Sequence, residues 1–394
     1  MSVAAALGWI VAAGQAASAA PFLVEMVAGL PRARAAARTD AISAPDTVVL
    51  IPAHNEALGI GPALRALADG LPASIRLLVV ADNCSDDTAA IARAEGVEVI
   101  ERADASLRGK GFALAFGRDH LLGAPPAVVI VVDADCAADP GSLARLAAAT
   151  ALADRPVQSL NLIRPRLDAP AIVQISSFAF LVKNLVRQRG LARLGAPLPL
   201  CGTGMALPWP LFRDAALASG NIVEDLALSV ELALAGRPAG FEEGATIWSD
   251  PAAQSATMSQ RARWEGGFLQ TARTHGLPLV GHGLRRLRPS LAWLGLHVAT
   301  PPLALLMLLH VAAFALTVLL GLLGAGWGPP ILSGLVLGAV GTVVLAAWAM
   351  YGRRWLSPVT LAKLPLYMAW KVPLYLRLLT GRGPRGWVRT DRGG

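Results

Sequence analysis

Two aspartates separated by one residue, Asp133 and Asp135, directly follow a run of valines and isoleucines at positions 128–132. Two carboxylates this close repel each other unless a cation lies between them. A hard divalent ion such as Mg²⁺ or Mn²⁺ prefers carboxylate oxygen and often bridges to the phosphates of a substrate. Acidic turns are also common at protein surfaces. Taken alone, the pair therefore predicts either a metal site or an exposed turn.

Similar polar clusters follow two other apolar runs. Residues 52–56 (PAHNE) and residues 82–88 (DNCSDDT) each come directly after a short stretch of aliphatic residues. Within them, Asn55 and Ser85 are typical helix caps. Three polar clusters after three neighbouring apolar runs predict one shared crevice rather than three unrelated turns.

The elements that must position these clusters are short β-branched runs that alternate with amphipathic stretches. The expected strands are Thr47–Ile51, Leu77–Ala81, Val97–Ile100 and Val128–Val132, and the expected helices are Ala57–Ala68, Asp86–Ala94, Lys110–Leu122 and Gly141–Ala153. This alternation predicts a layered α/β fold with a parallel sheet, whose ligands bind beyond the carboxyl ends of the strands. No GxGxxG follows the first strand, which disfavours a dinucleotide-dependent dehydrogenase.

The composition predicts membrane segments around this α/β domain. Hydrophobic residues make up 54% of the chain, charged residues 16%, and the mean hydropathy is +0.51. One bilayer crossing needs about 20 apolar residues, and Ser290–Gly352 contains no Asp, Glu, Lys or Arg. This segment predicts two spans that turn at Gly324–Pro330, because glycine and proline end helices. The uncharged Met1–Val24 predicts another span. A cleaved signal peptide is the less favoured alternative, because no positive charge precedes the apolar stretch.

The basic residues beside these spans indicate one orientation. Arg32 follows the first span, Arg285, Arg286 and Arg288 precede the second, and Arg353 and Arg354 follow the third. Basic flanks face the cytoplasm, so we expect residues 32–289 and the C-terminus inside, in a multi-pass protein of the inner (plasma) membrane. Much of the positive charge behind the net charge of +8 lies at these flanks and in the C-terminal tail, where anionic lipid headgroups are the expected partner. Nucleic-acid binding is not expected, because there is no basic stripe with interleaved aromatics.

From Asp46 to about Phe268, the chain resembles the family 2 glycosyltransferases of the GT-A fold, above all the membrane-integrated members related to cellulose synthase, hyaluronan synthase and ceramide glucosyltransferase. The matching motifs, in order, are residues 52–56, Asp82 within 79–83 (VVADN), 109–114 (GKGFAL), Asp133 with Asp135, 223–225 (VED) and 260–264 (QRARW). Each motif alone is weak, but the ordered set is specific. The resemblance implies a Rossmann-like, mostly parallel sheet that binds a nucleotide-sugar.

The resemblance also assigns roles to residues of this chain. It implies nucleotide-sugar contacts for Pro52, Ala53, Glu56, Asp82, Lys110, Asp133 and Arg263, with Asp82 at the uridine part; Mg²⁺ or Mn²⁺ ligation by Asp133 and Asp135; catalysis by Glu224 and Asp225, with Asp225 as the general base; and acceptor or donor contacts for Gly202, Gln260 and Trp264. Two of these residues have an alternative interpretation. Trp264 is also typical of a membrane anchor, and Gly202, within residues 201–204 (CGTG), is equally typical of a plain tight turn.

Combined with the expected spans, the resemblance predicts the following organisation. An N-terminal transmembrane helix covers 1–31, a cytoplasmic GT-A catalytic domain 40–250, an interfacial helical segment 251–289, two transmembrane helices 290–323 and 331–352, and an interfacial helix with a basic tail 356–394. A fourth span in the last segment is less favoured, because prolines and lysines interrupt it.

The expected activity is inverting transfer of a sugar from a UDP-sugar to a membrane-associated acceptor, with a lipid favoured over a glycan. An acceptor hydroxyl needs a carboxylate to take its proton, and a cation stabilises the departing diphosphate. A processive polysaccharide synthase is the alternative, but Val223 stands where many such enzymes carry threonine. A membrane nucleotidyltransferase would need neither QxxRW nor the spans, and a transport component would need charged residues inside the membrane.

Overall fold

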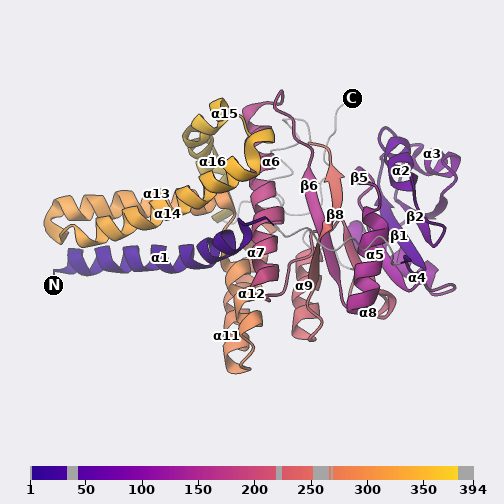
Figure 1. The fold of residues 1–394 in the computed structure, drawn as a ribbon, viewed down its shortest axis with the longest axis horizontal. Coiled ribbons are helices and arrows are strands. Elements are labelled where there is room, and N and C mark those ends of the chain that lie inside the picture. Colours follow the sequence, from indigo (N-terminus) through magenta and orange to yellow (C-terminus); the bar gives the residue numbers. More distant parts are fainter. Residues whose placement is uncertain (1, 33–42, 219–223, 252–265, 268, 380–394) are drawn as a thin grey trace. The chain divides into compact units, whose positions relative to one another are not determined.

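The computed structural model describes residues 2–32, 43–218, 224–251, 266–267 and 269–379, and the chain divides into two compact units (Figure 1). The sheet unit comprises the described residues of Ala33–Arg164 and Pro197–Ala252, and the helical unit those of Met1–Arg32, Pro165–Ala196 and Ala253–Pro384. The expected continuous domain over 40–250 is therefore interrupted, because residues 165–196 group with the membrane-type helices.

The sheet unit contains eight strands in the order β3-β2-β1-β4-β7-β6-β8-β5. The strands are β1 (Thr47–Ala53), β2 (Ile75–Asp82), β3 (Glu98–Arg102), β4 (Val128–Val131), β5 (Cys136–Ala138), β6 (Val157–Ile163), β7 (Met205–Pro208) and β8 (Gly240–Ser249). The helices are α2 (Ile60–Ala68), α3 (Thr88–Ala94), α4 (Lys110–Leu121), α5 (Ser142–Ala153), α8 (Trp209–Asp214) and α9 (Glu224–Leu234).

The first half of this sheet is buried on both faces. Val49 and Ile51 of β1 pack into the core beneath α2, α3 and α5, while Leu50 faces α4 on the other side of the sheet. A methyl group at Gly117 of α4 would lie 2.6 Å from Leu50 Cδ1, so the glycine is what lets this helix approach the strand. Burial on both faces is the reason that β1 and β4 are uninterrupted aliphatic runs.

The four strands and four helices expected from the sequence are all present, with ends that differ by a few residues. The second half of the sheet follows a pattern that the sequence did not predict. There β7 pairs antiparallel with both β4 and β6, and the edge strand β5 pairs antiparallel with β8. These strands are too short, or too rich in polar residues, to show a periodic pattern.

Among its described residues the helical unit contains no strand, and its regular elements are helices. They are α1 (Val3–Gly29), α6 (Ala171–Leu181), the π-helical turn η1 (Val182–Arg187), α7 (Gln188–Arg193), the π-turn η2 (Ala272–Gly276), α11 (Leu277–Arg285), α12 (Pro289–Ala299), α13 (Leu303–Leu320), the π-turn η3 (Gly321–Ala325), α14 (Gly328–Met350), the 3₁₀ turn η4 (Gly352–Arg354), α15 (Pro358–Ala362) and α16 (Leu364–Leu379).

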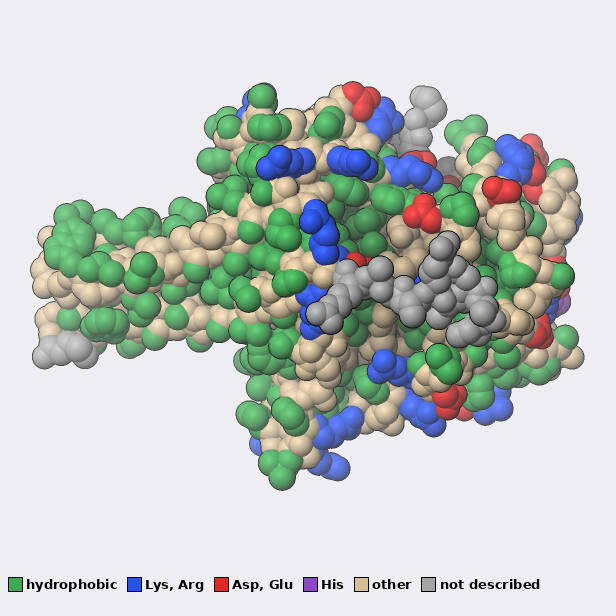
Figure 2. All heavy atoms as spheres, in the orientation of Figure 1, with side chains coloured by type: hydrophobic (Ala, Val, Ile, Leu, Met, Phe, Trp, Pro, Cys, Tyr) green, Lys and Arg blue, Asp and Glu red, His purple; other side chains and the backbone are tan. Residues whose placement is uncertain are grey.

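Three helical segments of this unit are long and apolar enough to cross a membrane: Val3–Gly29, Leu303–Ala325 and Gly328–Met350. Figure 2 shows hydrophobic side chains and no charged ones over the projecting part of these helices on the face in view. The expected single helix over 290–323 is instead divided into α12 and α13. Pro301 and Pro302 lack the amide hydrogens that a continuous helix would need at that point.

Candidate functional site

The polar clusters predicted to share a crevice lie at one edge of the sheet. Strands β1, β2 and β4 are parallel, and Ala53 at the end of β1 is in register with Ala81 of β2. Asp82 is the last residue of β2, and Asp133 follows β4 after one residue. The carboxyl ends of the three strands therefore present their polar residues on the same side.

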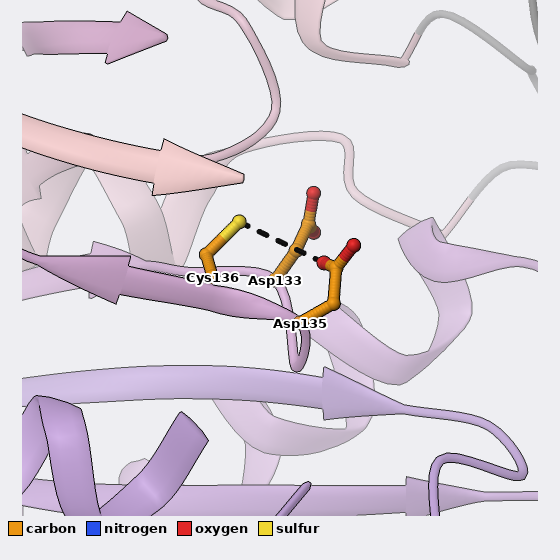
Figure 3. Close-up of side chains that lie close together, drawn as sticks. All are labelled: Asp133, Asp135 and Cys136. Atoms are coloured by element: carbon orange, nitrogen blue, oxygen red, sulfur yellow. Dashed lines mark hydrogen bonds between the residues drawn. The ribbon is translucent and has the colours of Figure 1, made fainter. Parts of the chain in front are cut away.

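Asp133 and Asp135 lie in the turn between β4 and β5, beside the buried thiol of Cys136 (Figure 3). The potential ligand atoms of these three residues lie within 4.8 Å of one another. Cys136 Sγ is 3.7 Å from Asp135 Oδ1 and 3.2 Å from Ser249 Oγ. Burial raises the pKa of the Cys136 thiol well above its usual range, so the thiol stays protonated. With the thiol protonated, the cluster offers the two carboxyl groups as ligands, and carboxylate oxygen fits a hard divalent cation.

Lys110, the first residue of α4, connects this pair of carboxylates to a second loop. Its ammonium group donates hydrogen bonds to Asp133 Oδ1 and, over 2.6 Å, to the carbonyl oxygen of Gly202. Burial disfavours the charged form, but the negative charges of Asp133 and Glu224 outweigh it and raise the pKa of Lys110. Lys110 is therefore a permanent cation at the centre of the site.

The loop that carries Gly202 is held by residues that sequence reasoning missed. The buried amide of Gln158 donates to the carbonyl oxygens of Thr203 and Gly204 over 2.9 and 3.2 Å, and its oxygen accepts from the amide of Cys201 over 2.9 Å. Gly204 has a φ of 64°, and a methyl group there would lie 1.9 Å from a side-chain oxygen of β6. No distinct signal in the sequence marks Gln158, because it lies in a strand that also contains Ser159 and Asn161.

Glu224 and Asp225 begin α9 and lie close to the same loop. A methyl group at Gly202 would be 3.2 Å from Asp225 Oδ2 and 3.4 Å from Lys110 Nζ. Asp225 Oδ1 accepts a hydrogen bond of 2.8 Å from the amide of Leu226. Burial, together with the adjacent negative charge of Asp225, raises the pKa of Glu224 to about 7. The structure therefore brings Asp133, Lys110, Gly202 and Asp225 into one connected group.

The loops after β1 and β2 are tied to each other and to the first residue of α3. The amide of Glu56 donates to Thr88 Oγ1 over 2.7 Å, and Asn55 exchanges hydrogen bonds with Ser85. The expectation that Asn55 and Ser85 cap helices was wrong, because the residues before α2 and α3 are Gly59 and Asp87. Pro52 and Ala53 are the last two residues of β1, beside the end of β2.

Three expected site residues cannot be placed with this group. Gln260, Arg263 and Trp264 of the QxxRW motif lie outside the described residues. Their assigned contacts with the nucleotide-sugar and the acceptor stay predictions.

Comparison with known proteins identifies the family to which this chain belongs. A family model described as glycosyltransferase like family 2 matches residues 45–267. This match covers more than half of the chain, and the chain therefore belongs to that family. It includes every motif on which the resemblance was based, and so confirms it.

Sequence relatives agree with this membership, and a solved structure shares the fold. Uncharacterized glycosyltransferases of Mycobacterium bovis and Mycobacterium tuberculosis are 36% identical over 100 residues, which span 25% of this chain and 41% of theirs. A mannosyltransferase from Pyrobaculum calidifontis, in complex with GDP-Man and Mn²⁺, has a TM-score of 0.53 at 17% identity and covers 96% of this chain and 95% of its own. This likeness and the family match confirm the predicted α/β fold of the GT-A kind.

A more distant structure covers part of the chain. Glucosyl-3-phosphoglycerate synthase from Mycobacterium tuberculosis, in complex with Mn²⁺, UDP and phosphoglyceric acid, is 20% identical with a TM-score of 0.39 and covers 57% of this chain and 78% of its own. The matched region of the mycobacterial sequence relatives is less than half of their length.

Proposed function

We propose that this protein is an inverting glycosyltransferase that moves a sugar from a UDP-sugar to a lipid acceptor at the membrane. The observation that supports this proposal is the bridge made by Lys110, which bonds to both Asp133 and the carbonyl of Gly202. The carboxylate of Asp225 lies against that same glycine. A group for the donor diphosphate and a group for the acceptor proton thus meet at one loop, as direct transfer between two bound substrates requires.

In this proposal Asp225 takes the proton of the acceptor hydroxyl, and Lys110 stabilises the negative charge that develops on the diphosphate. The acceptor hydroxyl gives its proton to Asp225 while its oxygen bonds to the anomeric carbon of the sugar. The bond from that carbon to the diphosphate oxygen breaks, and UDP leaves with the electron pair. Attack from the side opposite UDP inverts the anomeric centre. The ammonium group of Lys110 reduces the negative potential where the diphosphate charge develops.

Asp133 and Asp135 are the residues that would hold Mg²⁺ or Mn²⁺, and such an ion would supply positive charge beside the departing diphosphate. The Mn²⁺ and GDP-Man bound by the mannosyltransferase of the same fold support a divalent ion here. Nucleotide-sugar contacts by Pro52, Ala53, Glu56, Asp82 and Arg263, and acceptor contacts by Gln260 and Trp264, are part of the same proposal.

The membrane part of the proposal rests on the three apolar helices of the helical unit. We infer a multi-pass protein of the inner membrane with its catalytic domain in the cytoplasm. An acceptor that is itself a membrane lipid would be confined to the surface in which these helices are anchored. The alternative is a processive polysaccharide synthase, whose acceptor would be a growing glycan chain.

Donors that carry separate labels test the reaction. Purified full-length protein would be incubated with membrane lipids, Mn²⁺ and UDP-sugars labelled either in the sugar or in the phosphate. We expect a single lipid-soluble product that carries the sugar label only, and loss of this product when the metal is chelated. A phosphate label in the product would indicate nucleotidyl or sugar-phosphate transfer instead, and a ladder of long products would indicate a polymerase.

An Asp225→Asn variant tests the base, with Glu231→Gln as a matched control. Both residues lie on α9, but Glu231 is exposed and is not among the residues of the site. Loss of a general base lowers turnover by about 10²–10⁴-fold, and we expect this loss in Asp225→Asn alone. Near-normal turnover in Asp225→Asn would remove Asp225 from the mechanism.

A further inference from the structure

Arg102, the last residue of β3, is a nearly buried guanidinium group at the same edge of the sheet. Its Nη1 donates to Asp82 Oδ1 over 2.6 Å and to the carbonyl oxygen of Leu107 over 2.9 Å. Its Nη2 donates to Asp104 Oδ2 over 3.2 Å. The group also lies 5.7 Å from the centre of the Phe112 ring. Arg102 is therefore fixed by four neighbours, and it fixes the carboxylate of Asp82 in turn.

A second donor reaches the same oxygen of Asp82. Asn83 Nδ2 donates to Asp82 Oδ1 over 3.0 Å. Asn83, whose φ is 53°, is itself held in place, because its side-chain oxygen accepts a 2.7 Å hydrogen bond from the amide of Asp104. A carboxylate oxygen has two lone pairs, so these two donors occupy Oδ1. Within the part of the chain that the structure describes, no donor contacts Oδ2, which is the oxygen that Asp82 offers to a ligand.

The position of Asp82 in the sheet indicates which part of a nucleotide it meets. The strand order turns at β1, with β2 and β3 on one side of it and β4 on the other. Ligands of such sheets bind across this turning point, beyond the carboxyl ends of the strands. Asp133 and Asp135 mark the β4 side as the place of the metal and the diphosphate. The nucleoside then extends over the ends of β1, β2 and β3, where an anionic side chain suits a base with N–H donors.

We propose that Arg102 and Asn83 determine base specificity by leaving Asp82 a single acceptor oxygen, which favours uracil over guanine. Uracil presents one ring N–H between two carbonyl groups. Guanine presents a ring N–H and an amino group side by side and pairs best with both oxygens of a carboxylate, one of which is already occupied here. A site with the wrong number of partners leaves a buried polar group unpaired, which is costly. The inference rests on the proposed function, because it assumes that the crevice holds a nucleotide-sugar.

Binding measurements on the full-length protein test this inference without depending on turnover. Dissociation constants for UDP and for GDP would be measured by calorimetry in the presence of Mn²⁺. We expect the wild type to bind UDP at least about tenfold more tightly than GDP, a difference typical of one unmatched hydrogen bond. Arg102→Gln and Asn83→Gly should both reduce this ratio to about threefold or less, because each frees a lone pair of Oδ1 for guanine.

The control variant is Arg93→Gln. Arg93 forms an exposed ion pair of 2.6 Å with Glu101, the residue before Arg102. Arg93 itself does not contact Asp82. Arg93→Gln should keep the wild-type ratio of the dissociation constants for GDP and UDP. Asn83→Gly guards against misfolding, since glycine accepts the positive φ at this position and no charge is removed.

The outcomes separate this inference from the proposed function. Equal affinity for UDP and GDP in the wild type, or an unchanged ratio in both variants, would overturn the base proposal. Tighter binding of GDP than of UDP, together with sugar transfer from a GDP-sugar, would overturn the base proposal but not the proposed glycosyltransferase activity. Tighter binding of UDP than of GDP, with a smaller ratio in the two variants but no sugar transfer, would support the base proposal and overturn the proposed glycosyltransferase activity.

Discussion

Glu224 is a carboxyl group whose pKa depends strongly on its neighbours. It lies beside Asp225 at the start of α9, where burial and the adjacent negative charge raise its pKa to about 7, against the opposing effect of the Lys110 ammonium group. Two carboxyl groups this close titrate as a pair. Near neutral pH, the pair therefore retains part of one proton, while the proposed mechanism needs Asp225 ionised.

This environment predicts a pH-dependent stability. Because the pKa of Glu224 is raised from 4.5 to about 7 in the folded protein, folding favours its protonated form. The contribution of this group to the free energy of unfolding is complete below about pH 4.5 and is lost as the pH rises through about 7. The loss is on the order of 3 kcal/mol. In Glu224→Gln this loss should be absent. Thermal unfolding of the metal-free wild type and variant across this range measures it, and parallel curves would contradict the assignment.

At the scale of elements, α1 crosses η1 and α7 at two glycines. A methyl group at Gly29 would lie 1.8 Å from the carbonyl oxygen of Val186, and one at Gly190 would lie 2.1 Å from that of Glu25. Small residues permit such close helix approach in membrane proteins. At the same crossing, the buried carboxylate of Glu25 pairs with Arg187 over 2.7 Å and with His297 over 3.0 Å. The crossing thus joins an apolar span to residues that the sequence placed in the sheet domain.

Gly190→Ala tests this crossing. The added methyl group must push the helix backbones apart, and overpacking of this kind costs about 1–3 kcal/mol. Gly14→Ala is the matched control, because Gly14 also lies in a helix of the crossing but has no neighbour within 4 Å of the added carbon. We expect thermal unfolding in detergent at a lower temperature for Gly190→Ala, and at an unchanged or higher one for Gly14→Ala. Similar unfolding temperatures for both variants would mean that the close approach is not required.

At the scale of the whole molecule, the flanking arginines predict which ends of the spans face the cytoplasm. Trp327, which is 55% exposed, lies between α13 and α14, while Arg286 follows α11. The positive-inside rule places Trp327 outside and Arg286 inside. The three native cysteines, Cys84, Cys136 and Cys201, belong to the sheet unit and should face the cytoplasm as well.

Cysteine labelling tests this topology. In intact cells, a thiol reagent that cannot cross the membrane should label Trp327→Cys but neither Arg286→Cys nor the wild type. After the cells are opened, Arg286→Cys should become labelled too. Labelling of Arg286→Cys in intact cells would reverse the proposed orientation and place the catalytic residues on the wrong side for a cytoplasmic donor.

Features formed by residues that are adjacent in the chain could be predicted from the sequence. The strand Val128–Val131 and the turn with Asp133 and Asp135 are contiguous, so the aliphatic run and the acidic pair were visible together. Prolines at 301 and 302 were equally visible, yet the sequence was interpreted as one helix over 290–323. Hydropathy is summed over a window, and it does not register that two prolines remove backbone donors.

The sequence by itself determined the fold class, the family and the apolar spans, because periodicity, ordered motifs and hydropathy are properties of residues close along the chain. Only the tertiary structure decided which distant residues form the site. It brought Lys110 to Gly202, Arg102 to Asp82 and Glu25 to Arg187, and it grouped residues 165–196 with the membrane-type helices. Such contacts depend on how strands and helices pack, and no spacing in the sequence encodes them because the packing energy is shared among many residues.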